Sequence, residues 1–231
     1  MTSSIPTGGY AVMAQRREPP DALDLFPTPP FATRALLEHV IGDVRGGTGW
    51  EPACGYGHMS DVLRERFGKV IASDVFDYGG HAVGSFVGQG LDVIETPRPA
   101  PHWIITNPPF NLAVEFVERA LQEAREGVAL LLRTQWLETE ERYERLFRDS
   151  PPTIYAPFVE RVAMVKGRWD PQASTATAYA WFVWRRLPLL PGQTGLGSWG
   201  TSTSVIWIPP GCKKRLTKPD DVQRFAGRGA A

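Results

Sequence analysis

Apolar and polar positions along the chain follow two different patterns. In three segments apolar residues recur every three or four positions, which predicts helices that bury one face. These segments are 31–41, 59–67 and 113–124. Between them lie short continuous apolar runs, typical of strands buried inside a sheet. These runs are 70–74, 102–110 and 127–133.

The pattern changes after residue 150. A weaker helical period over 136–149 is the last of the alternating elements. Residues 153–167 and 174–186 are then rich in β-branched and aromatic side chains, which predicts two antiparallel strands. Because helices and strands alternate up to residue 149, we expect an α/β fold with a mostly parallel sheet and an antiparallel strand near its C-terminal end.

The same patterns divide the chain into three parts. Residues 1–25 form an irregular N-terminal arm, 26–187 form the predicted domain, and 188–231 form an extension with a basic tail. Short strands are also expected within 85–94 and at 205–208. The length of 231 residues, with 42% apolar and 22% charged residues, suits one globular domain with appendages.

Charge is balanced over the chain but not along it. Lys plus Arg and Asp plus Glu both number 25, and this net charge of zero excludes a uniformly basic nucleic-acid binder. The tail from Gly211 to Ala231 has six basic and two acidic residues, a net charge of +4. Such a tail either contacts phosphates or is a solvated, frayed terminus, and the sequence leaves both open.

Signals for membranes, secretion and metals are weak. No window reaches the ~20 consecutive apolar residues of a membrane helix, so no membrane partner is expected. The N-terminal segment lacks the order of a signal peptide, and the expected location is the cytoplasm. Cys54 and Cys212 make neither a disulfide framework nor a four-ligand zinc site, so no metal is expected.

Candidate chemistry lies where predicted strands end, because ligands of such sheets bind at the carboxyl ends of the strands. The first candidate is EPACGYG, residues 51–57, whose small residues let a ligand approach the backbone before a helix. Its acid, Glu51, would suit a cationic amine. The segment matches neither the dinucleotide fingerprint nor the P-loop pattern.

Acidic residues follow the next strands. Asp74 ends the strand at 70–74, where a carboxylate can accept hydrogen bonds from both ribose hydroxyls of a nucleoside. Asp77 is near enough in sequence to take this role instead. Asp92 lies in the following loop, where it could accept from an adenine amino group. Each acid alone is more often a solvated loop residue, and it is their succession after a glycine turn that indicates a nucleoside site.

The tetrapeptide Asn107-Pro108-Pro109-Phe110 is the most specific signal. Two successive prolines hold their carbonyls in a stiff, extended shape. The Asn107 side-chain oxygen and a proline carbonyl could then accept two hydrogen bonds from one planar amino group, while Phe110 stacks on the ring that bears it. Because both amino protons are then engaged in hydrogen bonds, the nitrogen lone pair becomes less conjugated and more nucleophilic.

With these elements in this order, the chain resembles S-adenosylmethionine-dependent amino-methyltransferases, in particular N6-adenine DNA methyltransferases. The segment FPTPP at 26–30 is similar to the family's methionine-binding segment, and its place before the glycine turn is the gamma order. The similarity covers about residues 25–185. The small size of the chain and its FPTPP segment resemble phage or prophage forms of the family. This resemblance implies a Rossmann-like methyltransferase fold with a seven-stranded sheet and helices on both faces.

The resemblance also implies a role for each matching residue. S-adenosyl-L-methionine would be the cofactor and DNA the partner. Asn107 and the Pro108 carbonyl would grip the target amino group, with Pro109 and Phe110 completing the catalytic tetrapeptide. Phe110 would stack on the target base, and Trp169 would either cover the base's other face or shield its own turn. The residues expected to contact the cofactor are Thr28, Glu51, Ala53, Cys54, Gly55, Gly57, Asp74, Asp92 and Asn107.

The implied reaction is direct methyl transfer to a base that has left the duplex stack. It needs no covalent intermediate, so Cys54 is expected to pack as a small residue. Gamma-order enzymes usually carry a large target-recognition domain, whereas about 45 residues follow Arg186. We therefore expect short or loose target recognition by the 75–100 loop, the 166–175 hairpin, the tail or an arm with Arg16 and Arg17. Further phosphate-contact candidates are Arg133, Arg161, Lys166, Arg168, Arg185 and Arg186.

Other functions share the tetrapeptide. Guanine-N2 methyltransferases of RNA and glutamine-N5 methyltransferases of proteins also act on a planar amino group, and a non-catalytic relative that binds cofactor or nucleic acid is a further alternative. Phe110 after the prolines favours a nucleic-acid substrate, and FPTPP favours DNA adenine over RNA. The sequence does not indicate the recognition site or the oligomeric state.

Overall fold

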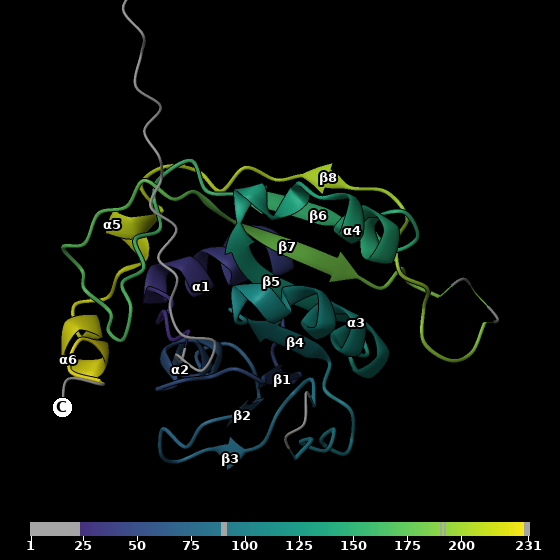
Figure 1. Ribbon diagram of the computed structural model, residues 1–231, viewed down its shortest axis with the longest axis horizontal. Helices are drawn as coiled ribbons and strands as arrows, with labels where there is room; N and C mark the ends of the chain where they lie inside the picture. Colours follow the sequence, from purple (N-terminus) through teal and green to yellow (C-terminus); the bar gives the residue numbers. More distant parts are fainter. Residues whose placement is uncertain (1–23, 89–91, 190, 192, 229–231) are drawn as a thin grey trace, which may run out of the picture.

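The apolar runs form the strands of one central sheet. The computed structural model describes residues 24–88, 92–189, 191 and 193–228 (Figure 1). The strands are β1 (Thr48–Glu51), β2 (Lys69–Asp74), β3 (Ala82–Val83), β4 (Trp103–Thr106), β5 (Gly127–Arg133), β6 (Ile154–Pro157), β7 (Tyr179–Arg185) and β8 (Ser204–Val205). Within the described residues they make an eight-stranded sheet in the order β3-β2-β1-β4-β5-β7-β6-β8.

Strand direction determines which ends meet. β1 pairs in parallel with β2 and β4, and β4 pairs in parallel with β5. β7 runs antiparallel to both β5 and β6, and β8 is parallel to β6. The carboxyl ends of β1, β2 and β4 therefore lie together at one edge, whereas the carboxyl end of β7 lies at the opposite edge, beside the start of β5.

Helices cover both faces of the sheet (Figure 1). One face carries α1 (Pro30–Leu36), extended by a π-helical turn (Leu37–Ile41), with α2 (His58–Leu63) and α5 (Cys212–Leu216). The other face carries α3 (Ala113–Glu123), then α4 (Glu140–Arg142) and a π-helical turn (Tyr143–Phe147). α6 (Asp221–Phe225) lies beside α2 at the end of the chain.

Alternation along the buried strands supplies both cores. In β5, Ala129 and Leu131 face α1, while Val128 and Leu130 face α3. Successive strand residues point to opposite faces, so a strand covered on both sides reads as a continuous apolar run. The start of β5 must be Gly127, because a methyl group there would lie 2.3 Å from the Trp103 ring.

The predicted α/β architecture is confirmed, with corrections at its periphery. The sheet has eight strands within the described residues rather than seven, since β8 adds to β6. The short strand expected within 85–94 lies instead at 82–83, and Ser85 and Val93 form a single bridge. The helix expected over 136–149 is broken into short turns around α4, consistent with its weak apolar period. At 205–208 only the first residue belongs to β8, with one further bridge at Ile208.

Residues 211–228 of the basic tail are folded onto the domain, which differs from the frayed terminus that the sequence left open. α5 packs on α1, and α6 packs against α2 through Val62 and Phe225. Arg215 pairs with Glu38, and Arg228 pairs with Asp61. No helix in the described part of the chain is long and apolar enough to cross a membrane.

Candidate functional site

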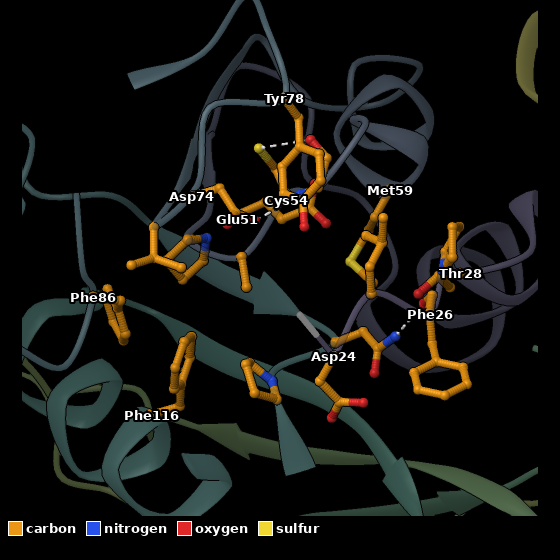
Figure 2. A pocket seen from close by; sticks show the side chains of 18 of the residues that line it. Asp24, Phe26, Thr28, Glu51, Cys54, Met59, Asp74, Tyr78, Phe86 and Phe116 are labelled. Carbon is orange, nitrogen blue, oxygen red and sulfur yellow. Dashed lines mark hydrogen bonds between the residues drawn. The ribbon is translucent and has the colours of Figure 1, made fainter. Parts of the chain in front are cut away.

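A pocket of about 230 Å³ lies at the carboxyl ends of β1, β2 and β4. Each of these strands ends in a candidate side chain: Glu51, Asp74 and, just after β4, Asn107. A segment from the N-terminal side, residues 24–28, forms a further wall. Figure 2 shows labelled side chains from these elements around one cavity, with Asp74 and Glu51 on the side opposite Asp24. The predicted site residues that line the pocket are Thr28, Glu51, Ala53, Cys54, Gly55, Asp74, Asn107 and Pro109.

The glycine turn follows β1 and is shaped by two left-handed residues. Gly55 has φ +50° and Gly57 has φ +77°, conformations that L side chains rarely adopt. The Cys54 N–H donates to the Ser73 carbonyl at 3.0 Å, which attaches the turn to β2. The Gly57 N–H donates to the Cys54 carbonyl at 2.8 Å and closes the turn. Backbone atoms of this turn therefore form one wall of the pocket.

Two buried carboxyl groups face the pocket. Glu51 is 2% exposed and accepts a hydrogen bond from the Ser60 hydroxyl, and Asp74 is 7% exposed. Burial raises the pKa of Glu51 well above its usual range, and the neighbouring Asp74 raises it further. Burial also raises the pKa of Asp74, although the Gly55 N–H at 2.8 Å and the Phe76 N–H at 3.1 Å hydrogen-bond to its carboxylate. A cationic ligand would stabilise the ionised form of both groups.

Asn107 carries an unsatisfied acceptor. Its Nδ2 donates to the Phe26 carbonyl at 2.9 Å, and this carbonyl can only accept, so the amide nitrogen must face it. Its Oδ1 is buried and has no hydrogen-bond partner among the described residues. A buried acceptor without a donor costs free energy, so this oxygen is suited to receive a donor from a ligand.

The N-terminal strap, which we define as residues 24–28, joins three parts of the site. The Phe110 N–H donates to Asp24 Oδ2 at 3.3 Å. The Leu25 carbonyl accepts from the Gly167 N–H at 2.8 Å. The side chain of Leu25 packs on the glycine turn, so that a methyl group at Gly55 would lie 2.6 Å from Leu25 Cδ1. The strap thus holds the glycine turn, the tetrapeptide and the 166–175 hairpin together.

Phe110 lies beside the pocket rather than in its lining. Its half-buried ring packs 6.3 Å from the Phe26 ring and 6.4 Å from the Tyr179 ring, measured between centroids. The Arg133 guanidinium lies 4.6 Å from the Phe110 ring centroid, at cation–π distance. Arg133 therefore lies next to the aromatic ring that the sequence assigns to base stacking.

Aromatic side chains that sequence reasoning missed complete the pocket. Phe86 and Phe116 contact each other at 5.0 Å between centroids, and Figure 2 shows them on the same side of the cavity. Tyr56 and Tyr78 meet edge to face at 4.8 Å, and burial raises the pKa of Tyr78 to about 12. Phe116 lies on the apolar face of a helix, where its sequence position indicates only a core residue.

Several expected residues are not brought to the pocket. Gly57 and Pro108 lie outside its lining, and Asp92 is exposed, with its backbone carbonyl accepting from the Ser85 N–H at 2.8 Å. Trp169 is 5% exposed and packs against Val62 and Phe225, so its ring is occupied by a small cluster of its own. This position matches the shielding role that the sequence offered as the alternative for Trp169.

Arg185 and Arg186 lie at the edge of the sheet opposite the pocket, because β7 is antiparallel. Arg185 donates to the Ile41 carbonyl at 2.7 Å, and Arg186 donates to the Gly197 carbonyl at 2.8 Å. Both arginines therefore anchor chain segments at that edge of the sheet. Arg168 pairs with Asp170 in the hairpin, and the N-terminal Arg16 and Arg17 lie outside the described residues.

Comparison with solved structures returns methyltransferase folds. A type I restriction-modification methyltransferase subunit from Streptococcus thermophilus matches 86% of this chain and 52% of its own, with TM-score 0.51 and 10% identity. The M protein of the type I restriction enzyme EcoKI matches 85% and 52%, with TM-score 0.49 and 14% identity. The Pyrococcus horikoshii protein PH1948, a proposed RNA methyltransferase, matches 72% and 89%, with TM-score 0.49 and 16% identity.

The similarity to the Streptococcus thermophilus subunit shows that the chain has a Rossmann-like methyltransferase fold. The chain spans about half the length of the two restriction-modification proteins, 52% of each. No protein-family model and no curated protein sequence matches it.

Proposed function

We propose that this chain transfers a methyl group from S-adenosyl-L-methionine to the exocyclic N6 amino group of adenine in DNA. The observation that carries the proposal is the buried Oδ1 of Asn107, which has no partner among the described residues and belongs to the pocket at the end of β4. The Asn107 oxygen can accept a hydrogen bond from an amino group. The Phe26 carbonyl fixes the Asn107 amide in the orientation that this bond requires.

The residues of the pocket suit this cofactor. Glu51 and Asp74 are buried acids whose ionised forms a cationic ligand would stabilise, and the cofactor carries both an ammonium and a sulfonium group. Asp74 ends β2, where a carboxylate can accept from ribose hydroxyls, and Phe86 and Phe116 offer apolar rings to an adenine. Thr28 and the Ala53–Tyr56 backbone would contact the methionine portion. When bound, S-adenosyl-L-methionine supplies a methyl group that its sulfonium makes electrophilic.

The chain contributes orientation and hydrogen bonding to the transfer. Asn107 Oδ1 and the Pro108 carbonyl accept from the target amino group, which directs its nitrogen lone pair toward the pocket. Much of the rate enhancement would come from this positioning. Cys54 plays no covalent part, because burial raises the pKa of its thiol and keeps it protonated.

A target adenine in a duplex would have to leave the stack, which costs on the order of a few kcal/mol. Phe110 is the aromatic residue nearest to Asn107 along the chain, and Arg133 beside it is an exposed cation available to a phosphate. The FPTPP segment that forms much of the strap favours DNA adenine over RNA, since its likeness is to DNA adenine enzymes.

Product analysis tests the proposal. The protein is incubated with methyl-labelled S-adenosyl-L-methionine and with duplex DNA, single-stranded DNA or ribosomal RNA, and each nucleic acid is digested to nucleosides. We expect labelled N6-methyldeoxyadenosine from the wild type and at least a ~100-fold loss with Asn107→Ala, the range for removing an essential transition-state hydrogen bond. Asn111→Ala, an exposed asparagine just after the tetrapeptide, is the matched control and should retain activity.

Each other outcome points to a different function. Label in RNA guanine would replace the proposal with the RNA guanine-N2 reaction. No label in these nucleic acids, with label in a glutamine side chain when a protein is supplied in a further reaction, would indicate the glutamine-N5 reaction. Cofactor binding without transfer to any of these substrates would indicate a non-catalytic relative.

A further inference from the structure

The C-terminal tail contacts the glycine turn directly. Arg228 lies just after α6, and its Nη1 donates to the Tyr56 carbonyl at 2.9 Å. Its Nη2 pairs with Asp61 Oδ2 at 2.5 Å. Tyr56 lines the pocket, so one side chain of the tail reaches the wall of the candidate cofactor site from behind.

Arg228 holds the peptide unit between Tyr56 and Gly57. This unit precedes a glycine, whose backbone can rotate more freely than that of other residues. The Tyr56 carbonyl and the Gly57 N–H belong to the peptide unit that joins these two residues, and Tyr56 is flanked by two glycines with positive φ, Gly55 and Gly57. Glycine has more accessible backbone conformations than any other residue, so such a turn is poorly restrained on its own. Here Arg228 fixes the carbonyl side of the peptide, and the Cys54 carbonyl fixes its N–H side at 2.8 Å.

Further contacts hold α6 in place behind the turn. His58 Nε2 hydrogen-bonds with the Phe225 carbonyl at 3.1 Å, and the two rings stack with centroids 5.7 Å apart. Phe225 is fully buried and also packs on Val62 and Trp169. Asp221, at the start of α6, is fully buried and forms a bidentate ion pair with Arg34 at 2.6 and 2.7 Å. The position of Arg228 is therefore fixed by the fold and not by a single surface contact.

We propose that Arg228 is a positioning residue for the cofactor site: it holds the 56–57 peptide so that the glycine turn is already shaped for its ligand. This inference rests on the proposed function, because it takes the pocket to be the site of S-adenosyl-L-methionine. Arg228 acts through Tyr56 and does not line the pocket. Preorganisation of this kind raises affinity by removing the cost of ordering the turn on binding.

The chain provides a matched control in Arg224. Both arginines lie over the Phe225 ring, at 4.7 Å for Arg224 and 4.9 Å for Arg228, and both pair with acids. Arg224 pairs with Glu65 at 3.2 Å and, within the described chain, has no contact with the glycine turn. Arg224→Gln and Arg228→Gln therefore remove the same charge from the same helix end, but only the second releases the Tyr56 carbonyl.

The test is calorimetric binding of S-adenosylhomocysteine to the full chain, with thermal melting of each variant. We expect Arg228→Gln to weaken binding about tenfold, the size of one charge-assisted hydrogen bond, and Arg224→Gln to bind within twofold of the wild type. The two variants should melt at similar temperatures. Arg228→Lys, which keeps one charged donor but not both contacts, should bind with an affinity between those of Arg228→Gln and the wild type.

Equal affinities for Arg224→Gln and Arg228→Gln would overturn the positioning role while leaving the cofactor site in place. Failure of the wild type itself to bind S-adenosylhomocysteine would overturn both this inference and the proposed function. Should Arg228→Gln not fold, comparison of Arg228→Lys with Arg224→Lys makes the same test, because the single ammonium cannot hold Tyr56 and Asp61 together as the guanidinium does.

Discussion

At the scale of the residue, the orientation of the key amide in the site is fixed by a neighbouring group that can only accept a hydrogen bond. The Phe26 carbonyl can only accept, so it fixes the Asn107 amide and leaves Oδ1 without a donor among the residues that the structure describes. Gly55 also depends on its neighbours. Its positive φ disfavours any L side chain, and the adjacent Leu25 leaves no space for one. Small changes at such positions should alter ligand binding more than stability.

Substituting Gly55 tests this expectation. Gly211 also has a positive φ, +88°, in the left-handed region, but a methyl group there meets nothing within 4 Å. Gly211→Ala and Gly55→Ala should each lose about 1–2 kcal/mol of folding free energy through left-handed strain alone. Leu25 can move aside in Gly55→Ala, but it then disturbs a wall of the pocket. We therefore expect urea denaturation to show similar losses and S-adenosylhomocysteine binding to weaken only in Gly55→Ala.

A Gly55→Ala variant that binds as tightly as Gly211→Ala would contradict this account. Leu25→Ala combined with Gly55→Ala should restore part of the lost affinity, because the contact between the two side chains is then removed.

At the scale of the element, one buried arginine bridges α1, the end of α2 and the tail. Arg34 on α1 donates to Asp221 from α6 and, at 2.9 and 2.8 Å, to Glu65 just after α2. Glu65 also pairs with Lys218 at 2.9 Å. Burial opposes ionisation of Glu65, but hydrogen bonds from Arg34 and Lys218 outweigh it and lower its pKa to about 2.

Removing Arg34 should therefore be costly. In Arg34→Met, Asp221 is left buried without its ion-pair partner, and we expect a loss of about 3–5 kcal/mol in the free energy of unfolding measured with urea. Arg45→Met is the control, since it breaks the exposed Arg45–Asp43 pair and should cost far less than Arg34→Met. A small loss in both variants would show that Arg34 is not needed to hold α6.

At the scale of the whole molecule, charges that are separated along the chain are matched in space. The tail carries +4, and Glu38, Asp61 and Glu65 in the domain accept most of its cations. The tail is therefore part of the folded unit, and acidification should act on the whole structure through the groups at this contact.

His58 provides the clearest pH dependence. Burial lowers its pKa to about 4, below the ordinary value of 6.5, although its hydrogen bond to the Phe225 carbonyl and nearby Asp61 favour the charged form and Arg228 opposes it. The unfolded chain then binds the proton more readily than the folded chain. Stability is fully present above pH 6.5 and falls by roughly 3 kcal/mol as the pH drops toward 4.

Melting temperatures between pH 7 and pH 4 check this slope. His58→Gln keeps a donor for the Phe225 carbonyl but does not titrate, so its melting temperature should change less over the range between pH 6.5 and 4.5. Parallel curves for the wild type and His58→Gln would exclude His58 as the source. Glu65 adds to the loss in both proteins below about pH 4.5, because its pKa is lowered in the folded state.

Local sequence was sufficient to predict what the sheet brings together. Glu51, Asp74 and Asn107 follow three strands that prove to be neighbours, and parallel pairing places their ends at one edge. The sequence leaves two roles open for Trp169, because a hairpin tryptophan has the same local pattern whether it faces a ligand or packs on a helix. The sequence places Arg185 among the candidates for phosphate contact because it does not show at which edge of the sheet the strand ends.

The role of the tail could not be predicted for a different reason. Arg34 and Asp221 are 187 residues apart, and no local period connects them. A run of basic residues has the same composition whether it is solvated, bound to phosphate or paired with acids of its own domain. Only the three-dimensional arrangement distinguishes these cases.

The two outermost strands of the sheet have a consequence for self-association. β3 and β8 are each two residues long, whereas β5 and β7 in the interior are seven residues long and strongly apolar. A long, open edge strand is a template on which another chain can add by backbone hydrogen bonding, and a two-residue edge offers few such groups. Concentrated solutions of the folded protein should therefore resist strand-mediated aggregation, and the risk should arise only when partial unfolding uncovers β5 or β7.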